Sequence, residues 1–169
     1  MMAQKSMKTK RIATMGLMVA LAFILSYIEA LLPLNIGIPG AKVGLANLVV
    51  MVTMFTLGER DAVIISLVRV ILVGLTFGNM SMMMYSLAGA ALSLIAMILV
   101  KKIGKFTASG ISVIGGVFHN VGQILVAVFV LDTSSLFYYL PFLVIIGCAT
   151  GVIIGLLASL IIARIEKSL

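Results

Sequence analysis

The sequence predicts an all-α membrane protein with six transmembrane helices, and three observations lead to that prediction. Of its 169 residues, 63% are hydrophobic and only 10% are charged, whereas soluble domains are about half apolar and a quarter charged. The mean hydropathy is +1.31. Apolar segments bounded by charge, Pro or Gly recur along the chain, and a helix crosses a bilayer in about 20 residues, so the length allows about six crossings. We therefore expect a single integral membrane domain over residues 1–169, with no soluble catalytic module.

The expected helices follow one another with short connections. The first comes after the basic segment MMAQKSMKTKR, and its apolar stretch is too long for a signal peptide and lacks a small-residue cleavage site. We interpret it as a retained helix. The second and third are short and would be tilted or lie in a locally thin membrane. The expected ranges are 12–32, 42–57, 61–77, 80–100, 108–131 and 138–163.

The distribution of positive charge predicts the orientation, because short cytoplasmic loops are enriched in Lys and Arg. With the N-terminus inside, the outer loops hold only Lys42. We therefore expect both termini to be cytoplasmic, and the net charge of +7 to reflect topology rather than a nucleic-acid partner. The inner side would hold ten basic residues: Lys5, Lys8, Lys10, Arg11, Arg60, Lys101, Lys102, Lys105, Arg164 and Lys167.

Two outer connections differ from the short charged inner turns. The segment at 33–44 is rich in Pro and Gly, and the segment at 131–139 is polar and aromatic. Irregular backbone at membrane depth needs hydrogen-bond partners in protein or in a water-filled cavity. The two segments are therefore candidate lids of an outward-facing pocket. The alternative is ordinary interfacial loops, with Phe137, Tyr138 and Tyr139 in an aromatic belt.

Arg69 lies near the middle of the third apolar segment, where a charged side chain costs about 2.5–3.5 kcal/mol on insertion scales. It should face the interior of the bundle and have a partner. A guanidinium group offers forked donors that suit a carboxylate, a phosphate or a polar headgroup. The alternative is a structural ion pair with Glu29, near the outer end of the first helix.

The fifth apolar segment carries the densest polar cluster, Gly116, His119, Asn120 and Gln123, at spacings that share a helix face. This face would hydrogen-bond a ligand; the alternative is interhelical hydrogen bonding, which contributes about 0.6 kcal/mol per pair in membranes. Further polar residues begin the second and fourth helices on the outer side. The candidate substrate-binding residues are Arg69, His119, Asn120, Gln123, Asn47, Asn79, Lys42 and Glu29.

The sequence lacks the motifs that are typical of several enzyme classes. The sequence has no Walker A loop, no Gly-rich dinucleotide fingerprint and no nucleophile elbow. Its aspartates, Asp61 and Asp132, are isolated, although magnesium-dependent diphosphate chemistry needs clustered oxygen ligands. The sequence has one cysteine, Cys148, and one histidine, His119, and these two residues do not make up a set of nitrogen and sulfur ligands for a metal ion. We expect neither catalytic residues nor a metal or other cofactor, and predict that the protein is not an enzyme.

Small residues recur at four-residue spacing in two helices, a pattern that lets helix backbones approach closely. Gly147, Gly151 and Gly155 form one strip, which would serve packing within the bundle or docking of a partner. Gly16 and Ala20 form the other, in the cytoplasmic half of the first helix.

Three segments together resemble a known bacterial membrane family: PLNIGIPGAKVGLANLV at 33–49, FGNMSMMMYSLAGAALSLIAM at 77–97 and SVIGGVFHNVGQILVA at 112–127. They are similar to heptaprenyl diphosphate synthase component I, also named Gx transporter, a family that resembles the S-components of energy-coupling factor (ECF) transporters. The resemblance implies a six-helix S-component-like bundle in the bacterial plasma membrane. It also implies an ECF scaffold protein and ATPases as partners, with Gly16 and Ala20 resembling the strip that contacts the scaffold.

These observations predict a substrate-binding subunit that captures a small vitamin-like or isoprenoid/quinone-precursor-like molecule from the outer side for uptake driven by partner ATPases. Its partners would be that small-molecule ligand, the membrane lipid and the transporter subunits. Two alternatives remain open. One is a non-catalytic membrane accessory of prenyl diphosphate or quinone synthesis, and the other is a membrane subunit of a flavin- or quinone-linked extracellular electron-transfer system.

Overall fold

The structure is a computed structural model that describes residues 2–31 and 44–167. Within these ranges the chain forms α-helices and one short 3-10 helix and contains no strand, which confirms the all-α prediction. The elements are α1 (Met2–Leu31), α2 (Leu45–Thr56), α3 (Glu59–Thr76), α4 (Met80–Ile103), α5 (Ala108–Leu131), η1 (Ser134–Tyr139) and α6 (Leu140–Glu166).

Five of the observed helices lie close to their expected ranges, and α5 coincides with 108–131. The exception is the start of α1, which lies at Met2 rather than near residue 12. The basic segment contains no Pro or Gly and is rich in Met, Ala, Gln and Lys, which are strong helix formers. The helix therefore extends well beyond its apolar part.

Among the described residues, four helical segments are long and apolar enough to cross a membrane: Thr9–Leu31, Met80–Ile103, Ala108–Leu131 and Ser134–Glu166. The structure thus supports four of the six expected crossings. Helix α3 has 18 residues but carries Glu59, Arg60, Asp61 and Arg69. Helix α2 has only 12 residues, a length of about 18 Å against a hydrocarbon core of about 30 Å.

Helix α2 is enclosed by protein. Every residue from Val49 to Met54 is buried, and the helix contacts α1, α3 and α6. A helix that is apolar on all sides is suited to such a position. The short helix is therefore surrounded by neighbouring helices rather than by lipid.

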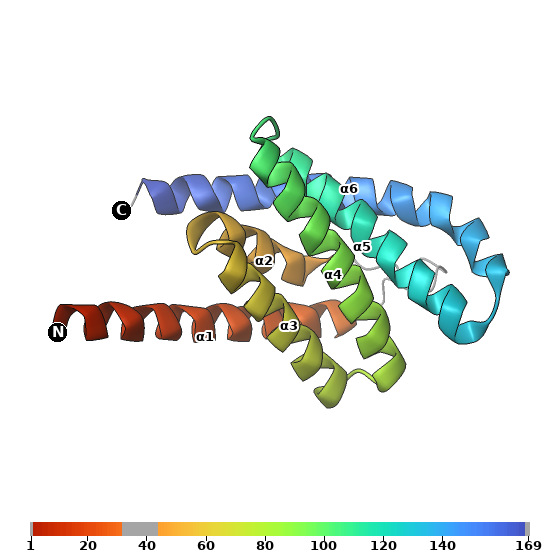
Figure 1. Cartoon of the computed structure of the whole chain (residues 1–169), viewed down its shortest axis with the longest axis horizontal. Helices are drawn as coiled ribbons and strands as arrows, with labels where there is room; N and C mark the ends of the chain where they lie inside the picture. The colour runs from red at the N-terminus through yellow and green to blue at the C-terminus, as the bar shows by residue number, and fades with distance from the viewer. Residues whose placement is uncertain (1, 32–43, 168–169) are drawn as a thin grey trace.

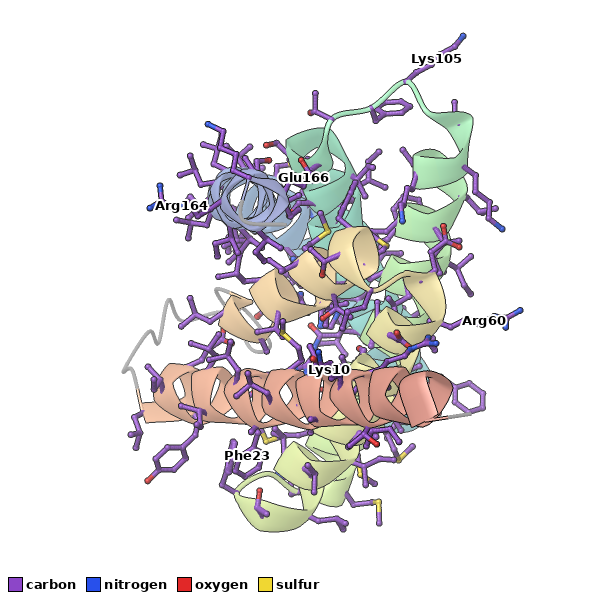
Figure 2. The ribbon with its side chains drawn as sticks, turned by 90° about the vertical axis from the view of Figure 1, so that its left-hand side faces the viewer. Lys10, Phe23, Arg60, Lys105, Arg164 and Glu166 are labelled. Carbon is purple, nitrogen blue, oxygen red and sulfur yellow. The ribbon has the colours of Figure 1, made fainter. Side chains whose placement is uncertain are left out.

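The chain begins and ends on the same side of the molecule, which we call the terminal end (Figure 1). The turn between α2 and α3 also lies toward this end (Figure 1). Figure 2 looks at the molecule from the terminal end, and the labelled Lys10, Arg60, Lys105 and Arg164 are spread across that view. In Figure 1 the turn between α4 and α5 lies at the top of the view, near the middle of the long axis, so the basic residues assigned to the inner side do not all lie at the terminal end.

An apolar core lies among five of the helices. It combines residues of α2, α3, α4, α5 and α6, all of them at most 8% exposed. Its buried members are Val50, Met51, Val52, Met54, Ala62, Leu94, Met97, Ile111, Ala158 and Ile162.

Glycines determine how closely α5 and α6 pack. A Cβ atom on Gly151 would lie 2.6 Å from the Val113 Cα, and one on Gly155 would lie 2.6 Å from the Ser109 Cα. Both distances are shorter than any van der Waals contact with a backbone atom. Of the two interpretations of the Gly147–Gly151–Gly155 strip, the structure therefore supports packing within the bundle.

The Gly16 and Ala20 strip has a different environment. Both residues are exposed, and a Cβ atom on Gly16 would meet no atom within 4 Å. Exposed apolar residues surround the pair on α1, among them Ile12, Leu17, Leu21 and Ile24. This strip therefore faces away from the bundle.

Candidate functional site

A polar cavity of about 50 Å³ lies among the helices. Since one water molecule needs about 10–15 Å³ by this measure, the cavity has room for about four. All six α-helices contribute to its wall. The lining residues are Glu29, Gly44, Ala46, Asn47, Met51, Arg69, Ser86, Ser93, Met97, Ser112, Gly115, Gly116, His119, Asn120, Thr150, Gly151 and Ile154.

Part of the cavity wall is apolar. Met51 and Met97 line the cavity and also belong to the apolar core, and Ile154 lies beside them in the lining with 3% of its surface exposed. The cavity is thus bounded in part by residues of the apolar core.

Arg69 is the only Lys or Arg among the described residues that line the cavity. Its Nη2 lies 3.5 Å from the Asn47 Oδ1, a long hydrogen bond. Its Nε is buried and has no hydrogen-bond partner within residues 2–31 and 44–167. Leaving a buried donor unsatisfied costs about 1–3 kcal/mol, and more for a charged group. The guanidinium therefore lies in the cavity wall with a hydrogen-bond donor, Nε, that a bound molecule could use.

Glu29 lines the same cavity from α1. Its Oε1 accepts a 2.6 Å hydrogen bond from the Gly44 backbone N–H, which connects the end of α1 to the start of α2. Gly44 has φ +80°, a left-handed conformation that glycine adopts without strain. The geometry at Glu29 therefore depends on glycine at this position.

Glu29 and Arg69 do not form the direct ion pair considered as the structural alternative. The two salt bridges among the described residues join Arg11 to Asp61 and Lys101 to Glu59. The Glu29 carboxylate nevertheless interacts electrostatically with the Arg69 guanidinium. The cavity is thus lined by one carboxylate and one guanidinium that are not in contact.

Asn120 fits both interpretations of the polar face on α5, interhelical hydrogen bonding and ligand binding. Its Nδ2 donates a 2.6 Å hydrogen bond to the Leu143 carbonyl oxygen of α6, so it does hold two helices together. It also lines the cavity, where it is 8% exposed. His119 lines the cavity as well, and its ring Cε1 lies 3.1 Å from where a Cβ on Gly89 would be.

Four hydroxyl groups also line the cavity. None of them is among the candidate residues expected from the sequence. They belong to Ser86, Ser93, Ser112 and Thr150. Ser86 and Ser93 are seven residues apart on α4, so they share one helix face. That spacing of two serines in an apolar helix is the signal that could have revealed them.

Five of the eight candidate substrate-binding residues line this cavity: Glu29, Asn47, Arg69, His119 and Asn120. Gln123 does not; its Cγ lies 2.9 Å from where a Cβ on Gly89 would be, so it packs against α4. Asn79 is exposed and caps α4, its Oδ1 accepting a 2.8 Å hydrogen bond from the Met82 N–H. Lys42 lies outside the described residues.

The two expected lids have different outcomes. The segment 33–44 lies outside the described residues except for Gly44, which lines the cavity. In the second segment, Phe137, Tyr138 and Tyr139 are exposed and do not line the cavity. Their exposure fits the aromatic belt better than a closed lid.

The chemistry available in the cavity is that of binding. A guanidinium, a carboxylate, an imidazole, two amides and four hydroxyls surround a volume suited to a compact polar molecule. Among the described residues, no group of three His, Cys, Asp or Glu side chains could hold a metal ion. Cys148 is a free thiol and does not line the cavity.

Comparison with known proteins identifies the family. No curated protein and no solved structure matches the chain significantly. The family profile described as heptaprenyl diphosphate synthase component I matches residues 18–161, a range that runs from α1 to α6 and includes every described residue of the cavity wall. The chain therefore belongs to the heptaprenyl diphosphate synthase component I family.

Proposed function

We propose that this protein is the substrate-binding subunit of a membrane transport system, and that it captures a small polar solute from the outer side of the membrane. The observation that carries the proposal is the cavity to which all six α-helices contribute and which is lined by Arg69, Glu29, His119 and Asn120. Such a cavity offers a compact polar solute a binding site within the helices. Release to the other side then requires a conformational change driven by a partner.

The energetics of the lining support ligand binding. A charged side chain within the membrane is costly, by about 2.5–3.5 kcal/mol on insertion scales, and Arg69 has a buried Nε without a partner. A solute that supplies an acceptor there would offset part of that cost. Four hydroxyls and Asn120 add hydrogen-bond capacity around it.

Access from the outer side follows from the arrangement of charge. The segments assigned to the inner side hold ten Lys and Arg residues, whereas the outer loops hold only Lys42, and the Lys- and Arg-rich side of a membrane protein faces the cytoplasm. The cavity lining includes Glu29 and Gly44, which flank the connection between α1 and α2 that the charge distribution assigns to the outer side. The cavity would therefore open toward the outer side of a bacterial plasma membrane.

Partner subunits would supply the energy, because the sequence contains no phosphate-cradling loop. We propose an ECF-type scaffold protein with its ATPases in this role. The outward-facing strip of Gly16 and Ala20 on α1 is the proposed contact. The protein itself would be non-catalytic.

Mass spectrometry of solutes released from the purified protein tests the proposal. Wild-type protein should release a small polar compound upon denaturation. Ser86→Leu should abolish its retention, because Ser86 lines the cavity and leucine would fill it. Ser81→Leu is the matched control, since Ser81 is exposed on the same helix and does not line the cavity. Retention by Ser86→Leu, or no compound from the wild type, would contradict the proposal.

The family description favours a second candidate, a non-catalytic accessory of prenyl diphosphate synthesis. The 50 Å³ cavity holds a compact group but not an isoprenoid chain, so such a ligand would place its chain elsewhere. Assays of a separate Asp-rich synthase with and without this protein distinguish the candidates. An accessory changes the yield or chain length of the product, whereas a transport subunit leaves both unchanged.

A further inference from the structure

Resting on the proposed function, we infer that the captured solute is a small zwitterion with a carboxylate and an ammonium group. Its carboxylate binds the Arg69 guanidinium and its ammonium group faces the Glu29 carboxylate. Three features of the cavity lead to this assignment: the unoccupied edge of Arg69, the charge balance of the lining, and the volume.

The first feature is the edge of Arg69 formed by Nε and Nη2. In the part of the chain that the structure describes, Nε has no hydrogen-bond partner and Nη2 makes only the 3.5 Å contact with Asn47. The same edge of Arg11 shows what suits it: Nε and Nη2 of Arg11 donate to the two Asp61 carboxylate oxygens at 3.0 and 2.7 Å. Parallel donors of this kind match a carboxylate in a bidentate pair.

The second feature is the charge balance of the cavity. Among the described residues that line it, Glu29 and Arg69 are the only Asp, Glu, Lys and Arg side chains, so the formal charges of these residues cancel. A bound monoanion would leave one uncompensated negative charge beside Glu29, and a phosphate would leave more. Burying an uncompensated charge is strongly unfavourable. A zwitterion preserves neutrality while supplying both an anion to Arg69 and a cation to Glu29.

The third feature is size. A volume of about 50 Å³ corresponds to about four water molecules, so the two charged groups of the solute must be a few bonds apart. Hydroxyls of Ser86, Ser93 and Ser112 and the apolar side chains of Met51 and Met97 then surround a short hydrocarbon segment. Compact amino acids have this composition.

Thermal unfolding of the purified full chain with five probes tests the inference. The probes are glycine, β-alanine and 4-aminobutyrate, which vary the charge separation, and acetate and methylammonium, which each carry one charge. At least one amino acid should raise the Tm with an apparent Kd at least tenfold lower than that of either single-charge probe. Acetate or inorganic phosphate binding as tightly as the amino acids, or no shift with any of the three, overturns the inference.

A charge substitution gives an independent readout. Glu29→Gln keeps an oxygen that can accept from the Gly44 N–H but removes the negative charge. Acetate should then bind about tenfold tighter than to the wild type, and the amino acid about tenfold weaker. Glu59→Gln is the control and should leave both affinities unchanged, because Glu59 lies outside the cavity. If a folded Glu29→Gln variant prefers the amino acid over acetate to the same extent as the wild type, the inference is overturned.

Failure of this inference is distinguishable from failure of the proposed function. If the solute released from wild-type protein is not a zwitterion but depends on Ser86, the transport proposal stands and the assignment of ligand class is wrong. If no solute is released at all, both are wrong.

Discussion

Arg11 of α1 holds the carboxylate of Asp61 at the start of α3 in a bidentate ion pair. Nη2 of Arg11 lies 2.7 Å from one carboxylate oxygen of Asp61, and Nε lies 3.0 Å from the other. The Asp61 side chain is only 3% exposed, whereas that of Arg11 is 58% exposed. The pair thus joins two helices and compensates a carboxylate that is buried at the edge of the bundle.

Replacing Arg11 should destabilise the protein. Arg11→Ala leaves the buried Asp61 carboxylate without its cation and removes its bidentate hydrogen bonds. Because Arg11 is largely exposed, solvent screens part of the interaction, and we expect a lower Tm in a protein that still folds. Lys10→Ala is the control, since Lys10 is exposed and forms no salt bridge among the described residues. Thermal unfolding in detergent measures both; equal Tm values would mean that the pair contributes nothing.

Gly151→Ala should also destabilise the protein, by about 1–3 kcal/mol. The new methyl group would lie 2.6 Å from the Val113 Cα, and backbone atoms cannot move aside as a flexible side chain can. Gly16→Ala adds the same methyl group where nothing lies within 4 Å. It should leave the Tm unchanged or raise it, because alanine favours helix by about 1 kcal/mol over glycine. The reverse order of Tm values would contradict the α5–α6 packing.

Asn120→Leu and Gln123→Leu should differ in their effect on binding. Asn120 lines the cavity, whereas Gln123 packs against α4 near Gly89. Solute retention by mass spectrometry should fall at least tenfold for Asn120→Leu and remain for Gln123→Leu. Asn120→Leu also loses the hydrogen bond to the Leu143 carbonyl, so size-exclusion chromatography must establish that it is folded. Similar losses in both variants would place the binding site along the whole α5 face.

The orientation can be tested with cysteines at Lys102 and Ser134, introduced one at a time in a Cys148→Ser background. Both positions are exposed, Lys102 near the end of α4 and Ser134 at the start of η1. An impermeant thiol reagent on intact cells should label Cys at position 134 and should label position 102 only after lysis. Labelling of both in intact cells would rule out the proposed topology.

Gly16→Leu should reduce assembly with a scaffold protein without reducing stability. The site faces outward with open space around it, so the bundle tolerates a large side chain, whereas a partner helix would be held away. Co-purification with the scaffold should decrease at least fivefold while the isolated variant stays monodisperse. Undiminished co-purification would exclude this strip as the contact.

Most helix boundaries were predictable because they depend on local signals. Charges, Gly and Pro end apolar runs wherever the chain leaves the membrane, and α5 begins and ends where the sequence predicts. The number of full crossings was less predictable. Apolar composition does not distinguish a helix that faces lipid from one enclosed by protein, and α2 is of the second kind.

The sequence alone determined that Arg69, His119 and Asn120 are polar residues within apolar helices and need partners, because burying such groups is costly in any membrane fold. Only the tertiary structure decided which of them share a cavity. His119 and Gln123 are one helical turn apart, yet His119 lines the cavity and Gln123 does not. Periodicity defines a helix face, but the neighbour opposite each position depends on crossing angles, and these are set by packing among all the helices at once.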